Sequence, residues 1–163
     1  MIDGVLYLAP SADFEHGEAG GEFYAELRAY LKRNALGRAT LETDVMLPDG
    51  GDVLRPDGCF LLKENWHKKK RRIHGAPDLV WEALSDSTAE RDLGEKSRRY
   101  LLCGVREYWL LDPRTRGLEV RYAMPDQNGK PCWETGFGPV RASRLLHGFE
   151  LDPREFWRFL DQA

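Results

Sequence analysis

The segment 77–85, Pro-Asp-Leu-Val-Trp-Glu-Ala-Leu-Ser, constrains the fold most because nearly all of its residues are apolar. Such a run is typical of a strand that is covered on both faces of a sheet. Successive side chains of a strand point to opposite faces, so Asp78, Val80 and Glu82 share one face. Glu82 is therefore predicted to lie in the interior, where an unpaired carboxylate is costly. It must meet a cation, a metal ion or a proton.

The segments around this strand indicate an α/β fold. Apolar residues at helical spacing predict a helix over 15–33 that ends at Asn34, and Asp152 is suited to cap a last short helix. The order of elements predicts an α/β sandwich with a mixed central sheet flanked by helices, a small antiparallel β extension and a single domain over 1–163. The predicted strands cover 40–47, 54–62, 77–85 and 105–111, followed by two antiparallel edge strands.

A lysine stands on the predicted inner face of the second long helix. Ser87 and Glu90 have the spacing of a capping box, and Gly104 is placed to end the helix. Lys96 shares one stripe with Ala89, Leu93 and Tyr100. If the helix folds back over the strand, Lys96 lies about 12 Å from the helix start. Glu82 lies about 10 Å back from the strand end, so the two side chains can meet.

Asp57 provides a second carboxylate at the start of strand 54–62, next to Pro56. Two carboxylates and a lysine suit phosphodiester hydrolysis, because oxygen ligands are what Mg²⁺ requires. The metal would polarise the phosphate and supply a hydroxide nucleophile. The lysine would orient or deprotonate the water, or stabilise the developing charge. Each assignment has an alternative. Asp57 and Glu82 could be a structural pair bonded to the backbone or to arginine, and Lys96 could pack its stem while its ammonium group stays in water.

The connector between these two strands is basic. Its run Lys68, Lys69, Lys70, Arg71 and Arg72 is a candidate for phosphate contacts, or else a solvated loop. Trp66 in the same connector is a candidate for stacking on a base, or else anchors the loop.

Composition limits the other possibilities. The net charge is -3 and the sequence pI is about 5.8, so any nucleic-acid contact must come from a local patch. The three cysteines are far apart and odd in number, which favours reduced thiols in a cytoplasmic protein. We expect no membrane association, because no apolar run approaches the roughly 20 residues of a span.

Four ordered motifs resemble one known pattern. They are Arg55-Pro56-Asp57, the run Ala76–Ser85, Lys96 with Tyr100, and the run Gly104–Pro113. Together they resemble the "putative restriction endonuclease" family of small bacterial proteins, within the PD-(D/E)xK nuclease superfamily. The resemblance implies the restriction-endonuclease-like fold and a divalent-metal nuclease site.

The resemblance also assigns roles to residues. It implies that Asp57 is the motif aspartate, Glu82 the motif acid and Lys96 the lysine. Asp78 is a weaker candidate as a further metal ligand, and His16, Glu18 and Glu22 are weaker candidates for accessory roles. The parent superfamily has a lysine two positions after the acid, where this chain has Leu84; the resemblance places that lysine at Lys96 on the following helix.

These observations predict an endonuclease that uses Mg²⁺ or Mn²⁺ and acts on DNA. Two cuts in a duplex favour a two-fold dimer, so we expect a homodimer. The alternative from another class is a non-cleaving nucleic-acid-binding or interaction protein on the same fold, because a fold does not fix function. A different metal-dependent phosphoesterase or an RNA nuclease is a third hypothesis.

Overall fold

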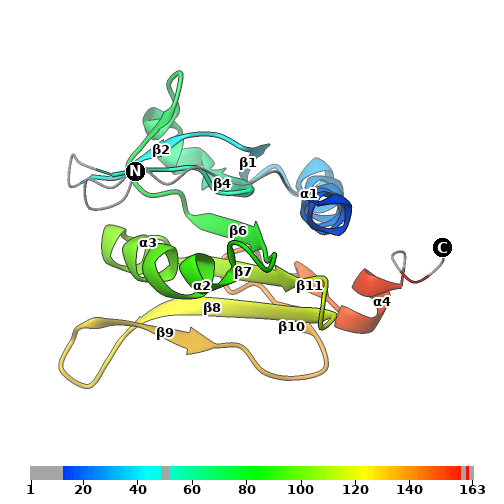
Figure 1. Ribbon diagram of the computed structural model, residues 1–163. Coiled ribbons are helices and arrows are strands. Elements are labelled where there is room, and N and C mark those ends of the chain that lie inside the picture. The colour runs from blue at the N-terminus through cyan, green and yellow to red at the C-terminus, as the bar shows by residue number, and fades with distance from the viewer. Residues whose placement is uncertain (1–12, 49–51, 159–160, 162–163) are drawn as a thin grey trace.

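The computed structural model describes residues 13–48, 52–158 and 161. Its centre is a six-stranded sheet, and Figure 1 shows how the elements surround it. The strand order is β1-β4-β6-β7-β8-β9. β6 and β7 run parallel, and every other pair of neighbours in this sheet is antiparallel. The predicted mixed sheet is therefore confirmed. The strands are β1 (Gly37–Leu41), β4 (Gly58–Leu62), β6 (Leu79–Ala83), β7 (Glu107–Asp112), β8 (Gly117–Pro125) and β9 (Pro131–Thr135).

Helices cover both faces of this sheet. The side chain of Asp13 accepts a hydrogen bond from His16 N–H and so caps α1 (Phe14–Arg33), which ends at Asn34 as predicted. The connection from β6 to β7 is a nearly continuous helix, as a parallel pair requires. It consists of α2 (Ala89–Arg91), the π-helical segment η2 (Asp92–Lys96) and α3 (Ser97–Cys103). Gly104 ends it with φ 97°, a left-handed conformation that suits glycine.

The remaining elements are short. Asp152 caps α4 (Pro153–Trp157), as the sequence predicts. η1 (Lys63–Lys68) is a 3₁₀ helix in the basic connector. Two small sheets consist of β2 (Val45–Met46), β3 (Val53–Leu54) and β5 (Ile73–His74), and of β10 (Arg141–Ala142) and β11 (Glu150–Leu151). Within the described ranges, no helix is long and apolar enough to cross a membrane.

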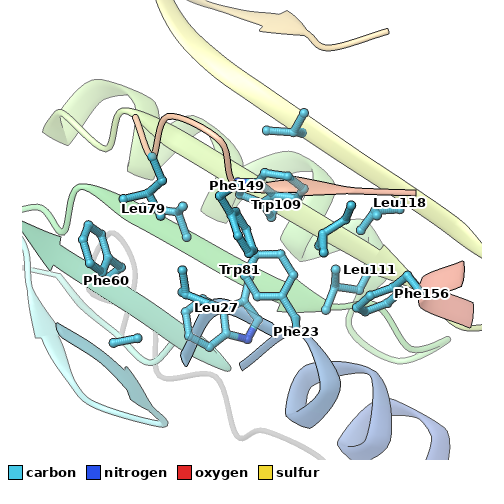
Figure 2. Close-up of a cluster of buried hydrophobic side chains, with 14 of the residues drawn as sticks. Phe23, Leu27, Phe60, Leu79, Trp81, Trp109, Leu111, Leu118, Phe149 and Phe156 are labelled. Carbon is cyan, nitrogen blue, oxygen red and sulfur yellow. The ribbon is translucent and has the colours of Figure 1, made fainter. Parts of the chain in front are cut away.

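The α1 face of the sheet holds the larger apolar core (Figure 2). Phe23 of α1 contacts the rings of Trp81 and Trp109, with ring centroids 5.1 and 5.2 Å apart. All three side chains are fully buried. Aromatic pairs at this separation add about 0.5–1.5 kcal/mol each to the effect of buried area. This packing fixes β6 and β7 from one side.

The opposite face carries a second core that includes Val80, Leu84 and Tyr108, with Tyr100 of α3 packed over them. Glu82 belongs to this face, between Val80 and Leu84, and is 1% exposed. The alternation inferred from the sequence therefore holds, and the buried carboxylate lies beneath the helical connection.

Three expectations about the elements are wrong. The predicted strand 40–47 is split into β1 and β2, because Glu42 adopts φ 45° and turns the chain. The predicted strand 54–62 is likewise divided between β3 and β4. No capping box starts the second helix: the residue before it is Thr88, whose side chain makes no capping bond. The predicted antiparallel β extension is confirmed: its two strands are β8 and β9, which continue the central sheet.

Candidate active site

Asp57 and Glu82 meet where β4 begins and β6 ends. The backbone N–H of Asp57 donates to Glu82 Oε2 at 3.2 Å. In return, the backbone N–H of Ala83 donates to Asp57 Oδ2 at 2.7 Å. These reciprocal bonds hold the two carboxylates against adjacent strands, and the Asp57 side chain keeps 27% of its surface exposed. The two acids that the sequence singled out are therefore neighbours.

Gly58 lets the Trp81 ring lie close to the backbone of β4 beside this centre. It pairs with Trp81 across the antiparallel ladder. A Cβ at position 58 would lie 1.9 Å from the Trp81 ring, so a larger residue would collide with a fully buried side chain. The absent side chain lets the indole lie over the strand directly after Asp57.

Lys96 and Tyr100 converge on the same oxygen of Glu82. Lys96 Nζ donates to Glu82 Oε1 at 2.8 Å, and the Tyr100 hydroxyl donates to it at 2.9 Å. Lys96 is 7% exposed and Tyr100 is fully buried. The helical connection thus brings the amine to the carboxylate, as the length comparison predicts.

Asp92 is a member of the cluster that sequence reasoning missed. Its Oδ1 lies 2.8 Å from Lys96 Nζ, and the residue is only 2% exposed. The π-helical segment η2 turns Asp92 and Lys96 inward together, while Leu93, predicted on the buried stripe, is 42% exposed. A π segment alters which residues share a face, and such segments recur at functional sites. The i, i+4 spacing of an acid and a lysine was the available signal.

His16 joins the site from the start of α1. Its Nε2 lies 3.3 Å from Asp57 Oδ1. The hydrogen bond with Asp57 raises the pKa of His16 above its usual value despite partial burial. Glu18 and Glu22 lie farther along the same helix, half-buried. The structure records no contact that joins either glutamate to Asp57 or Glu82 within the described residues, and burial raises the pKa of Glu22.

Negative charge dominates the buried cluster. Burial, opposed by Lys96 and helped by Asp57 and Asp92, raises the pKa of Glu82 to about 7. Burial lowers the pKa of Lys96, but its attraction to Glu82 and Asp92 outweighs burial and the net direction is upward. Lys96 therefore stays protonated, and its charge compensates only part of the charge of the surrounding carboxylates.

Asp78 lies apart from this cluster. Its Oδ2 accepts the backbone N–H of Leu62 at 2.9 Å, and its Oδ1 accepts the Asn65 amide at 2.8 Å. Leu62 ends β4, whereas Asp57 precedes that strand. Asp78 therefore ties the far end of β4 to the basic connector, and the structure does not bring it together with Asp57 and Glu82 as a metal ligand.

The carboxylates of Asp57 and Glu82 suit a hard cation that takes few of its ligands from the protein. Among the described residues, no group of three or more His, Cys, Asp or Glu side chains is arranged to hold a metal ion. That excludes a closed cage within this part of the chain, such as a structural zinc site. Mg²⁺ instead binds through one or two carboxylates and retains several waters. Asp57 and Glu82 fit that requirement.

The basic connector divides into two groups. Lys68 Nζ donates to the backbone oxygen of Ala76 at 2.9 Å, and Arg72 lies 3.3 Å from Asp44. These two residues stabilise the connector itself. The three cations between them, Lys69, Lys70 and Arg71, line a cavity beside the central sheet.

The fold defines the class of protein as an α/β domain with a mixed central sheet flanked by helices. It is similar to a crystal structure described as a "putative nuclease belonging to DUF820" from Anabaena variabilis, with a TM-score of 0.77. The alignment covers 98% of this chain and 89% of that one at 20% sequence identity, so the likeness concerns the fold.

Residues 1–154 match the family described as "Putative restriction endonuclease", also called Uma2, and the chain belongs to that family. The resemblance found in the motifs is therefore confirmed. No curated protein matches the chain.

Proposed function

We propose that the protein is an endonuclease that uses Mg²⁺ or Mn²⁺ to hydrolyse phosphodiester bonds in DNA. The observation that carries the proposal is the convergence of two carboxylates and a buried lysine at one point, with Glu82 contacting both Asp57 N–H and Lys96 Nζ. Membership of the family described as "Putative restriction endonuclease" supports the same reaction class.

Asp57 and Glu82 would hold the metal ion. When bound, the ion would polarise the phosphate and favour ionisation of a water molecule. Burial raises the pKa of Glu82 most, and Asp57 and Asp92 add to it. A divalent cation would compensate the negative charge of these carboxylates. Such compensation would explain why Asp57 and Glu82 are held close together despite their mutual repulsion.

Lys96 would act as a fixed positive charge. Its raised pKa, held up by Glu82 and Asp92, argues against a role as general base. A protonated amine at this position can orient the attacking water or stabilise negative charge on the phosphate. Tyr100 stays neutral, because burial raises its pKa well above the usual value, and its hydroxyl holds Glu82 in place.

DNA as the substrate and a homodimer as the active form belong to the same proposal. The three solvent-exposed cations Lys69, Lys70 and Arg71 offer phosphate contacts on a protein of net negative charge. A two-fold dimer would present two such sites to the two strands of a duplex.

The proposal is tested by nicking of supercoiled plasmid DNA in EDTA and in the presence of Mg²⁺, Mn²⁺, Ca²⁺ or Zn²⁺, which cover hard and borderline ions. We expect Asp57→Asn, Glu82→Gln and Lys96→Met each to lower the rate about 100-fold or more. Asp57→Asn is the safest for folding because its side chain is partly exposed.

Lys32→Met is the matched control for Lys96→Met, because Lys32 is an exposed lysine in the last turn of α1. Circular dichroism and the melting temperature establish that each variant is folded. Metal-dependent nicking that survives in folded Asp57→Asn and Glu82→Gln proteins would refute the proposed site. Binding of DNA without turnover in any metal would favour the non-cleaving alternative.

A further inference from the structure

A cavity of about 270 Å³ lies beside the edge strand β1 and the basic connector. Its wall includes Arg38 of β1, Trp66 of η1 and the cations Lys69, Lys70 and Arg71. Its volume is near the lower end of the range for small-molecule sites, which leaves room for one compact ligand.

Four positive side chains around this cavity lack compensating charge. Arg38, Lys69, Lys70 and Arg71 are exposed, and none forms an ion pair with a residue in the described part of the chain. The nearby acid Asp44 is instead engaged by Arg55 and Arg72. On a protein of net charge -3, this concentration of positive charge marks an anion-binding surface.

The Trp66 ring in the cavity wall contacts one of these cations, Arg38. The guanidinium of Arg38 lies 4.9 Å from the centre of the Trp66 ring, a cation–π arrangement. The indole N–H of Trp66 is buried and has no hydrogen-bond partner among the described residues. A buried donor without an acceptor is unfavourable, so a ligand that carries acceptor atoms would gain from it.

The hydroxyls in the wall are already engaged. Thr40 and Thr43 share a hydrogen bond of 2.9 Å, and the Thr43 hydroxyl donates to the backbone oxygen of Leu41 at 3.0 Å. These bonds stabilise the turn after β1. Besides the Trp66 indole N–H, the donors available to a ligand are therefore the guanidinium and ammonium groups, which favour phosphate.

The cavity opens on the face of the sheet that carries Glu82. Thr40 pairs with Cys59, and Cys59 pairs with Val80, across antiparallel ladders. Directly paired residues point to the same face, and Glu82 follows Val80 by two positions. Cys59 lines the cavity and is close enough to Glu82 for the carboxylate to help raise the pKa of its thiol to about 12, after burial.

We propose that this cavity is a nucleotide-binding subsite that holds one phosphorylated nucleoside unit beside the Asp57–Glu82 centre. Arg38 and Lys70 would contact the phosphate, and the cavity beside Trp66 would take the nucleoside. The identity of the ligand rests on the proposed nuclease function. The unit is either a free mononucleotide or one nucleotide of a bound strand.

Binding measurements in EDTA test this without any cleavage. The probes are deoxyadenosine 5′-monophosphate, deoxyadenosine and a 12-nucleotide single-stranded DNA, a length of roughly one single-strand binding site. Arg38→Gln and Lys70→Gln should each weaken binding of the phosphorylated probe about tenfold or more, as loss of a charged hydrogen bond does. Lys32→Gln removes an exposed charge outside the cavity and should have little effect.

Each result decides the matter. Dependence on Arg38 and Lys70 with the mononucleotide supports a mononucleotide site, and dependence only with the 12-mer supports a strand subsite. Absence of binding by both phosphorylated probes overturns the inference, as do equal affinities in all variants or tighter binding of deoxyadenosine. Nicking that requires Glu82, together with equal probe affinities in all cavity variants, would leave the nuclease proposal standing alone. Probe binding that depends on the cavity residues, without nicking in any metal, would support the subsite and count against the nuclease proposal.

Discussion

The Glu82→Gln variant should be more stable than the wild type at alkaline pH in the absence of metal. Burial, with Asp57 and Asp92 adding to it, raises the pKa of Glu82 from 4.5 to about 7 despite the neighbouring Lys96. Between these two pH values the folded protein keeps a proton that the unfolded chain loses. The free energy of unfolding therefore falls as pH rises through this window. Glutamine resembles the protonated acid and removes that dependence.

The size of the effect follows from the same shift. One pKa unit corresponds to about 1.4 kcal/mol, so the full difference is roughly 3 kcal/mol at pH well above 7. Near pH 5 most of this difference is absent, because this pH lies only slightly above the pKa of 4.5 at which the unfolded chain loses the Glu82 proton that the folded protein keeps. The stability gain of Glu82→Gln over the wild type should therefore grow by roughly 2 kcal/mol or more between pH 5 and pH 8.5.

Urea denaturation in EDTA, followed by circular dichroism at a series of pH values, measures this difference. Comparing the two proteins at each pH cancels the titration of all other groups that do not contact position 82. A difference that stays constant with pH would show that Glu82 has an ordinary pKa. A difference that falls with pH would show that Lys96 dominates its surroundings, and either result would refute the electrostatic reasoning.

Two further predictions concern groups around the centre. Asp92→Asn removes one of the two carboxylates that hold Lys96. We expect kcat for nicking to fall about tenfold. The Mg²⁺ concentration for half-maximal rate should stay unchanged, because the proposed metal ligands are intact. An unchanged kcat would contradict a positioning role. Gly58→Ala places a methyl group into the Trp81 ring and should lower the free energy of unfolding by about 1–3 kcal/mol. Gly21→Ala in α1, where a Cβ meets no atom within 4 Å, should instead raise it by about 0.5–1 kcal/mol, and equal effects of the two substitutions in urea denaturation would count against the packing argument.

The central parts of the fold were predictable because their sequence patterns are strong. The apolar run around Glu82 could be satisfied only by a strand covered on both faces, and it is β6 in the middle of the sheet. The stripe of Phe23 and Leu27 likewise required a long amphipathic helix, and both residues are fully buried. Burial of large apolar surface leaves few alternatives for such segments.

The turns were less predictable because they depend on tertiary contacts. Nothing in the residues around Glu42 demands a positive φ, yet the chain turns there so that β1 can pair with β4. The π-helical segment was equally hidden. An uninterrupted α-helix would have buried Leu93, whereas the observed segment buries Asp92 against Lys96.

The proximity of Asp57, Glu82 and Lys96 followed from strand periodicity, helix geometry and the family resemblance. His16 was a weaker candidate because its contact with Asp57 depends on how α1 lies relative to β4. The cavity at Arg38 could not be inferred, because it combines an edge strand with a connector whose path is set by Asp44, Asp78 and Ala76.

The most direct test of the central claim is the anomalous diffraction of crystals soaked with Mn²⁺. We expect an anomalous peak within coordination distance of carboxylate oxygens from both Asp57 and Glu82, with Lys96 still paired to Glu82, and loss of that peak in Asp57→Asn. Fully ordered side chains with no peak between these two acids, or a peak held by other residues alone, would contradict it.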